Sequence, residues 1–126
     1  MTKIQRFEDL VAWQKARQMA GSIYALTRKS KFARDFGLRN QITDAAGSVM
    51  HNIAEGFDSG YDAEFSRFLK TARRSASEVQ SQLYLALDAG YITEEELKKS
   101  YDLAVEVKKL LNGMLSYLKK LKKSND

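Results

Sequence analysis

The chain has 126 residues, which is enough for one domain and too few for two ordinary ones. It contains no cysteine and one histidine, His51, so disulfides, thiolate zinc sites, cysteine nucleophiles and multi-histidine metal sites are excluded. The absence of proline favours long helices, because proline is the residue that most sharply interrupts them. The 21 basic residues outnumber the 16 acidic ones, and a net charge of +5 permits binding to a polyanion without requiring it.

The first predicted element is a helix from about residue 7 to residue 29. Its apolar side chains recur at alternating spacings of four and three, which places them on one helix face: Ala12, Ala16, Met19, Ile23 and Leu26. Trp13, Ala20 and Tyr24 widen this stripe, so the helix is expected to contact more than one neighbour. Residues 30–34 are predicted to be a break, followed by Asp35 as the N-cap of the next helix.

The second and third predicted helices cover residues 36–58 and 62–89. The second carries an apolar stripe and a small-residue middle, residues 45–48, that allows another helix axis to approach closely. A turn around Gly60 separates the two helices. The third helix has the clearest stripe of the sequence, at heptad spacing: Phe65, Leu69, Ala72, Ala76, Val79, Leu83 and Ala86.

The fourth predicted helix covers residues 94–121. Gly90 fits the left-handed position after the preceding helix, and Thr93 with Glu96 forms a capping-box pattern. Four long helices with short connections predict an all-α fold, an antiparallel up-down-up-down four-helix bundle, as a single domain over residues 1–126. Because no stretch has the length and apolarity of a membrane span or a signal-peptide core, we expect a cytoplasmic protein with no membrane partner.

The sequence offers little for catalysis or for a cofactor. His51 and Glu55 lie four residues apart and could share a helix face, but two ligands alone make a poor metal site. Four carboxylates near the second connection could hold a hard cation, although helix capping and surface charge explain them better: Glu55, Asp58, Asp62 and Glu64. We therefore expect no catalytic residue, no metal and no cofactor, and predict that the protein is not an enzyme.

Two groups of basic residues are candidate phosphate contacts. The first lies on the third helix, where no acidic residue falls between Arg67 and Arg74: Arg67, Lys70, Arg73 and Arg74. The second lies on the fourth helix, after its acidic first turns: Lys108, Lys109, Lys119, Lys120, Lys122 and Lys123. The alternatives are a solvated charged face for the first group and complementation of the helix macrodipole for the second. Six lysines exceed what the macrodipole needs, and lysines bind phosphates with little sequence preference.

Aromatic residues outside the main stripes predict a second kind of surface. The chain has more aromatic side chains than the core of a small bundle normally holds: Trp13, Tyr61, Tyr84, Tyr91, Tyr101 and Tyr117. Tyr84 and Leu85 lie beside the core positions of the third helix, and Leu103 and Leu110 widen the stripe of the fourth. Uncovered apolar patches usually mark an interface, so we expect a homo-oligomer, with a wider intramolecular core as the alternative.

Several segments resemble one known protein family over nearly the whole chain. The most specific is the string Asn52-Ile53-Ala54-Glu55-Gly56, and the others lie in residues 7–16, 36–42, 48–57, 68–78 and 87–92. Together they resemble the four-helix-bundle family first noted in open reading frames inside 23S rRNA intervening sequences.

The resemblance implies a homopentameric barrel of four-helix bundles with no established catalytic activity. It also implies binding of RNA or DNA, a function proposed for the family. The accessory variability proteins of diversity-generating retroelements have a similar architecture, which gives a second interpretation: an accessory or scaffold protein that binds a partner such as a reverse transcriptase. Asn52 and Glu55 correspond to the polar pair of the family motif and are expected to hydrogen-bond across the bundle.

Overall fold

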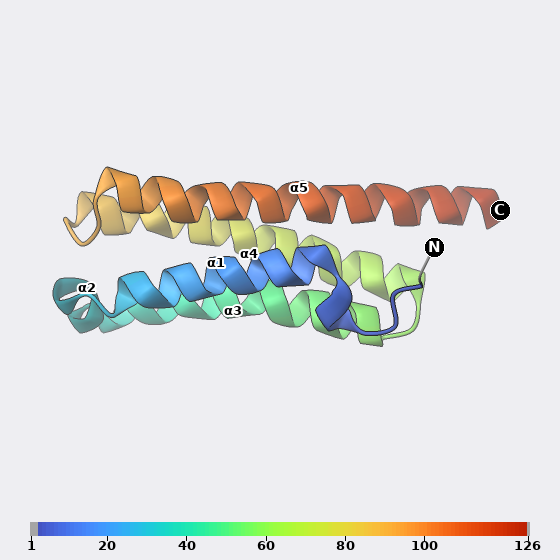
Figure 1. Cartoon of the computed structure of the whole chain (residues 1–126), viewed down its shortest axis with the longest axis horizontal. Helices are drawn as coiled ribbons and strands as arrows, with labels where there is room; N and C mark the ends of the chain where they lie inside the picture. The colour runs from blue at the N-terminus through green and yellow to red at the C-terminus, as the bar shows by residue number, and fades with distance from the viewer. Residues whose placement is uncertain (1–2, 126) are drawn as a thin grey trace.

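A computed structural model describes residues 3–125 as a bundle of long α-helices that lie side by side along their length (Figure 1). The long helices are α1 (Val11–Thr27), α3 (Phe36–Asp58), α4 (Asp62–Asp88) and α5 (Glu94–Asn125). A 3₁₀ turn, η1 (Phe7–Asp9), precedes α1, and a short helix, α2 (Ser30–Arg34), joins α1 to α3. Because no strand occurs in residues 3–125, the predicted all-α class is confirmed for that part of the chain.

The connections between the helices lie at the two ends of the bundle. One end holds α2 and the connection from α4 to α5, and the other holds η1 and the turn from α3 to α4 (Figure 1). Along the bundle, α3 packs on α4 and α4 packs on α5, while α1 contacts both α3 and α5. The C-terminal end of α5 extends past the α3–α4 turn (Figure 1).

The predicted helix boundaries are confirmed for α3 and α4 and need correction elsewhere. The first helix is shorter than predicted, because Leu10 has an extended backbone conformation that separates η1 from α1. The predicted break at residues 30–34 is wrong, since these residues form α2. The side chain of Phe32 explains why: it is fully buried, and its ring stacks on Tyr91 with 5.3 Å between the centroids. Helix α5 continues four residues beyond its predicted end at residue 121.

The core consists of the apolar stripes that the periodicity predicts. Six stripe residues of α4 are completely buried: Leu69, Ala72, Ala76, Val79, Leu83 and Ala86. The stripe of α1 is buried in the same way, from Ala12 to Leu26. Two side-chain contacts fix α1 beside α5, namely the Ser22–Ser100 hydrogen bond and the Lys15–Glu106 ion pair at 3.0 Å. Apolar burial therefore determines which face of each helix is left for solvent.

Helices α3 and α4 approach each other closely at Gly56. A Cβ atom at this position would lie 2.7 Å from the Cβ of Phe68 and 2.9 Å from the Cδ1 of Phe65. Real Cβ atoms essentially never approach other carbon atoms so closely, so the packing requires glycine here. Farther along, the hydroxyls of Ser48 and Ser75 hydrogen-bond across the same contact at 2.9 Å.

Polar side chains satisfy the helix ends where the sequence predicts them. Asp35 caps α3 by accepting the backbone N–H of Leu38 at 3.1 Å, and the hydroxyl of Tyr91 donates to its other oxygen at 2.9 Å. These two hydrogen bonds, the backbone one first, hold the pKa of Asp35 below its usual value. Gly60 and Gly90 have φ of 81° and 80°, the left-handed region that glycine favours.

The predicted capping box at the start of α5 is also formed. Glu96 accepts the backbone N–H of Thr93, and the hydroxyl of Thr93 accepts the backbone N–H of Glu96. Lys29, after the end of α1, donates to Glu96 at 2.6 Å. Its hydrogen bond is the largest cause that lowers the pKa of the Glu96 carboxyl, followed by the backbone hydrogen bond of Thr93.

Candidate nucleic-acid interface

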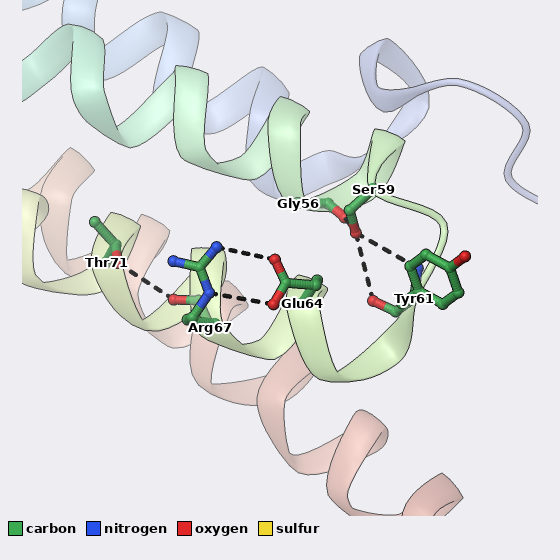
Figure 2. A network of polar contacts seen from close by, with 6 residues as sticks. All are labelled: Gly56, Ser59, Tyr61, Glu64, Arg67 and Thr71. Atoms are coloured by element: carbon green, nitrogen blue, oxygen red, sulfur yellow. Dashed lines mark hydrogen bonds and ion pairs between the residues drawn. The ribbon is translucent and has the colours of Figure 1, made fainter.

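The first predicted basic group lies on α4, and its first member is not a free cation. The guanidinium of Arg67 forms an ion pair with Glu64, with 2.9 Å between Nη2 and Oε2 (Figure 2). This contact lowers the pKa of Glu64 and raises that of Arg67. The expectation of an unneutralised ridge is wrong at this position, because residues three apart on a helix lie side by side and Glu64 precedes Arg67 by one turn.

Of the other three predicted basic residues of α4, two are exposed to solvent and one contacts α5. Lys70 and Arg74 are exposed, and Arg74 makes one long hydrogen bond, 3.4 Å, to the hydroxyl of Thr71 on its own helix. Arg73 is half-buried and donates to Oδ1 of Asn112 on α5 at 2.8 Å. Lys70 and Arg74 are therefore the members of this group whose charges face solvent.

The first two lysines of the α5 group differ in the same way. Lys108 is half-buried, and its ammonium donates to the side-chain oxygen of Gln80 on α4 at 3.0 Å. The expectation that Lys108 is a surface phosphate contact therefore needs correction, since this cation takes part in the contact between two helices. Lys109, one residue later, is exposed.

The remaining four lysines form the most concentrated positive charge of α5, here called the lysine tail: Lys119, Lys120, Lys122 and Lys123. All four are exposed, and none takes part in the ion pairs of residues 3–125. No acidic residue occurs between Val107 and Asn125. Leu118 is buried and Leu121 half-buried between the lysines, so the helix remains attached to the core at this end. The tail thus presents exposed cations at the end of α5 that extends past the α3–α4 turn (Figure 1).

Of the two polar residues of the family motif, Asn52 makes structural hydrogen bonds and Glu55 does not. Asn52 donates to the backbone oxygen of Ser48 at 2.8 Å and to its hydroxyl at 3.0 Å, and that hydroxyl bonds to Ser75 on α4. The predicted contact across the bundle therefore runs from Asn52 through Ser48. Glu55 does not take part as expected: it is exposed and makes none of the side-chain hydrogen bonds found in the described residues.

The side chain of Ser59 hydrogen-bonds to the backbone within the turn at the end of α3. The hydroxyl of Ser59 donates to the backbone oxygen of Gly56 at 2.6 Å (Figure 2). It also lies 3.4 Å from the backbone oxygen and 3.5 Å from the backbone nitrogen of Tyr61. Tyr61 itself is 73% exposed. The carboxylates considered for a hard cation do not converge there, because Glu64 is paired with Arg67, and the described residues contain no group of three possible metal ligands.

The predicted apolar surface is present on α4. Tyr84 is 49% exposed and Leu85 57% exposed, and the ring of Tyr84 packs edge-on against Tyr101 of α5 at 5.8 Å. Tyr117 and Tyr24 are also exposed. Tyr91 differs from the expectation, because its ring stacks on Phe32 and its hydroxyl binds Asp35.

One basic cluster was missed by the sequence analysis. Five cations occur within residues 28–39, around α2: Arg28, Lys29, Lys31, Arg34 and Arg39. Lys31 and Arg34 fall in the predicted break, and the other three lie at the ends of the two predicted helices that flank it, outside their apolar stripes. A count of charge in a sliding window would have found them, since this segment contains a single acidic residue, Asp35.

Comparison with known proteins decides the family of the chain. The family model described as "23S rRNA-intervening sequence protein" matches residues 8–113. The chain belongs to this family. The matched segment of this 23S rRNA-intervening sequence protein includes the basic residues of α4 and ends before the lysine tail.

A solved structure with the same fold supports the assignment. It is the crystal structure of a protein of unknown function from the S23 ribosomal protein family of Bacteroides thetaiotaomicron, which is 26% identical to this chain. The similarity covers 83% of this chain and 98% of that protein, with a TM-score of 0.78. No curated protein matches the chain. No helix in residues 3–125 is long and apolar enough to cross a membrane.

Proposed function

We propose that this member of the 23S rRNA-intervening sequence proteins is a non-enzymatic, cytoplasmic, oligomeric protein that binds RNA or DNA through its basic surface. The observation that carries the proposal is the lysine tail, with four exposed ammonium groups and no acidic residue on the last turns of α5. Lys70, Arg74 and Lys109 add exposed cations on α4 and α5. The name of this family refers to 23S rRNA, and the Bacteroides protein belongs to a family named for a ribosomal protein, which supports RNA as one of the ligands to test.

The chemistry of the tail predicts the kind of binding. An ammonium group interacts with phosphate as a point charge and carries no base-reading geometry, so affinity should depend little on nucleotide sequence. Each phosphate contact releases condensed counterions, so affinity should fall steeply as salt rises.

The proposal is tested by changing Lys119, Lys120, Lys122 and Lys123 together to alanine. We expect weaker binding to every sequence tested and a salt dependence flatter by about 3 logarithmic units per decade of salt for single strands. The matched control replaces the same four residues by arginine, which keeps the charge and should keep the slope. Equal affinity and equal slope for the alanine variant and the parent would remove the tail from the interface.

We further propose that the antiparallel up-down-up-down bundle is the subunit of a homopentamer. The exposed Tyr84 and Leu85 support self-association, because adjoining apolar side chains left in solvent usually mark an interface. A Tyr84→Glu substitution places a charge in that patch and should give a smaller particle in light scattering. A particle of parental mass would place the interface elsewhere.

The same patch supports a second candidate function, an accessory or scaffold protein whose partner is another protein, such as a retroelement reverse transcriptase. In that case Tyr84→Glu leaves the particle mass and the nucleic-acid affinity unchanged and abolishes co-purification with the purified partner. The two functions are therefore separated by measurements on one variant.

A further inference from the structure

The segment around α2, here called the α2 corner (residues 28–39), holds a second concentration of positive charge. Arg28, Lys31 and Arg34 are exposed and take part in none of the ion pairs or side-chain hydrogen bonds of the described chain. Lys29 is neutralised by Glu96. The one carboxylate of the corner, Asp35, accepts hydrogen bonds from the backbone N–H of Leu38 and the hydroxyl of Tyr91. The corner therefore keeps a positive excess at the end of the bundle opposite the α3–α4 turn (Figure 1).

An aromatic ring stands exposed among these cations. Phe36 is the first residue of α3, and its side chain is 63% exposed and does not pack on the core. The guanidinium of Arg39 lies over the ring, 4.8 Å from its centroid. Arg39 is in turn held by the backbone oxygen of Ala33 at 2.9 Å. The ring of Phe36 is therefore not part of the core, and one of its faces is covered by the guanidinium of Arg39.

The neighbouring acidic residues restrict what can bind. Asp88 at the end of α4 and Glu94 and Glu95 at the start of α5 are exposed, and they lie at the same end of the bundle. A broad anionic surface such as a membrane or a duplex lying across this end would meet these carboxylates as well as the cations. A thin, flexible strand can contact the corner alone. Aromatic rings with adjacent basic residues are the means by which proteins bind unpaired bases and their phosphates.

We propose that the α2 corner binds unpaired nucleotides of a single strand, with a base stacked on Phe36 and phosphates held by Arg28, Lys31 and Arg34. This inference rests on the proposed function, because it assigns a second contact and a strand preference to the same nucleic-acid partner. The two contacts are separated by the length of α3, which is about 35 Å for a helix of this size. Changes at one contact should therefore leave the other intact.

The test compares single-stranded oligouridine with an RNA duplex of equal length, by fluorescence anisotropy. Phe36→Ala should weaken binding of the single strand about tenfold and leave duplex affinity unchanged, because only unpaired bases offer a free face for stacking. Phe36→Trp keeps a stacking surface and should keep the affinity. Tyr61→Ala is the matched control, since it removes an exposed aromatic ring at the other end of the bundle.

A charge variant tests the phosphate contacts separately. Changing Arg28, Lys31 and Arg34 together to glutamine should lower the salt slope for oligouridine by about 2 units. Circular dichroism and light scattering on each variant measure whether the fold and the particle mass are those of the parent.

The outcomes separate this inference from the proposed function. If the parent binds oligouridine and Phe36→Ala binds it equally well, the α2 corner assignment is overturned while the lysine tail proposal stands. If the parent binds none of the probes, both are overturned. A change of particle mass in Phe36→Ala would identify the corner as a contact between copies of the chain and would also overturn the nucleotide assignment.

Discussion

The α3–α4 contact and the C-terminal half of α5 differ in how tightly their residues pack and in whether their polar groups have partners. At the α3–α4 contact, Gly56 leaves no room for a Cβ atom, and the polar side chains of Ser48 and Ser75 satisfy each other. In the C-terminal half of α5, a Cβ added at Gly113 would meet no atom within 4 Å, and the lysine tail is exposed without ion-pair partners in the described chain. The packed and hydrogen-bonded residues of the α3–α4 contact account for the fold, whereas the exposed lysines of α5 are the residues to which nucleic-acid binding is proposed.

The largest expected effect is at Gly56. Gly56→Ala should lower the free energy of unfolding by about 2 kcal/mol, because the new methyl group overlaps Phe65 and Phe68 on α4 and forces the two helices apart. Urea denaturation of the variant and the parent measures the difference. A variant as stable as the parent would show that the helices can separate without cost at this point.

Ser75→Ala should have a smaller effect at the same contact. It removes the hydrogen bond from α4 to Ser48 and should cost about 1 kcal/mol in urea denaturation. Ser77→Ala is the control, because Ser77 is exposed on the same helix. Equal stabilities of the two variants would mean that the Ser48–Ser75 hydrogen bond adds nothing to the contact.

Gly113→Ala should raise the free energy of unfolding, in contrast to the two preceding substitutions. No atom within 4 Å blocks a Cβ there, and alanine loses less backbone entropy than glycine in a helix, so stability should rise by about 0.5 to 1 kcal/mol. The substitution adds no charge, and nucleic-acid affinity should stay at the parental value. A loss of stability would show that this side of α5 is covered in the protein's assembled form.

The smallest effect concerns acid stability at the start of α3. The pKa of Asp35 is lowered in the folded protein by Leu38 and Tyr91, so its contribution to stability is present above the unfolded pKa of about 3.9 and is lost as pH falls through the folded value. Asp35→Asn should therefore be less stable than the parent at pH 7, and the difference should shrink in acid below about pH 4.

Stability measured by denaturation across that pH range checks the prediction. Asp44→Asn, an exposed position of the same helix, serves as the control. A stability difference between Asp35→Asn and the parent that is independent of pH would contradict the role given to the charged carboxylate.

Much of the bundle could be predicted because long helices repeat their burial pattern. The stripe of α4 has six completely buried residues at the predicted positions, and the caps at Asp35 and Thr93 follow from single residues and their neighbours. Helix α2 could not be found this way, since five residues are too few for a stripe and its single anchor is Phe32.

The candidate site was harder to predict, because it depends on which cations already have partners. Arg67 and Lys108 belong to the predicted set by type and spacing, yet Glu64 neutralises the first and Gln80 of a neighbouring helix holds the second. The partner of Arg67 is visible in the sequence at three residues' distance, but that of Lys108 becomes visible only when α4 and α5 are placed side by side. The tail lysines are exposed as the sequence suggests.

The most direct test of the central claim is binding of the unmodified protein to single strands, duplex DNA and structured RNA at about 50 and 200 mM salt, measured by fluorescence anisotropy. If the four tail lysines each contact a phosphate, affinity for a single strand should be about 50-fold weaker at the higher salt concentration. Absence of binding to every probe at the lower salt concentration would contradict the claim that the exposed basic surface binds nucleic acid.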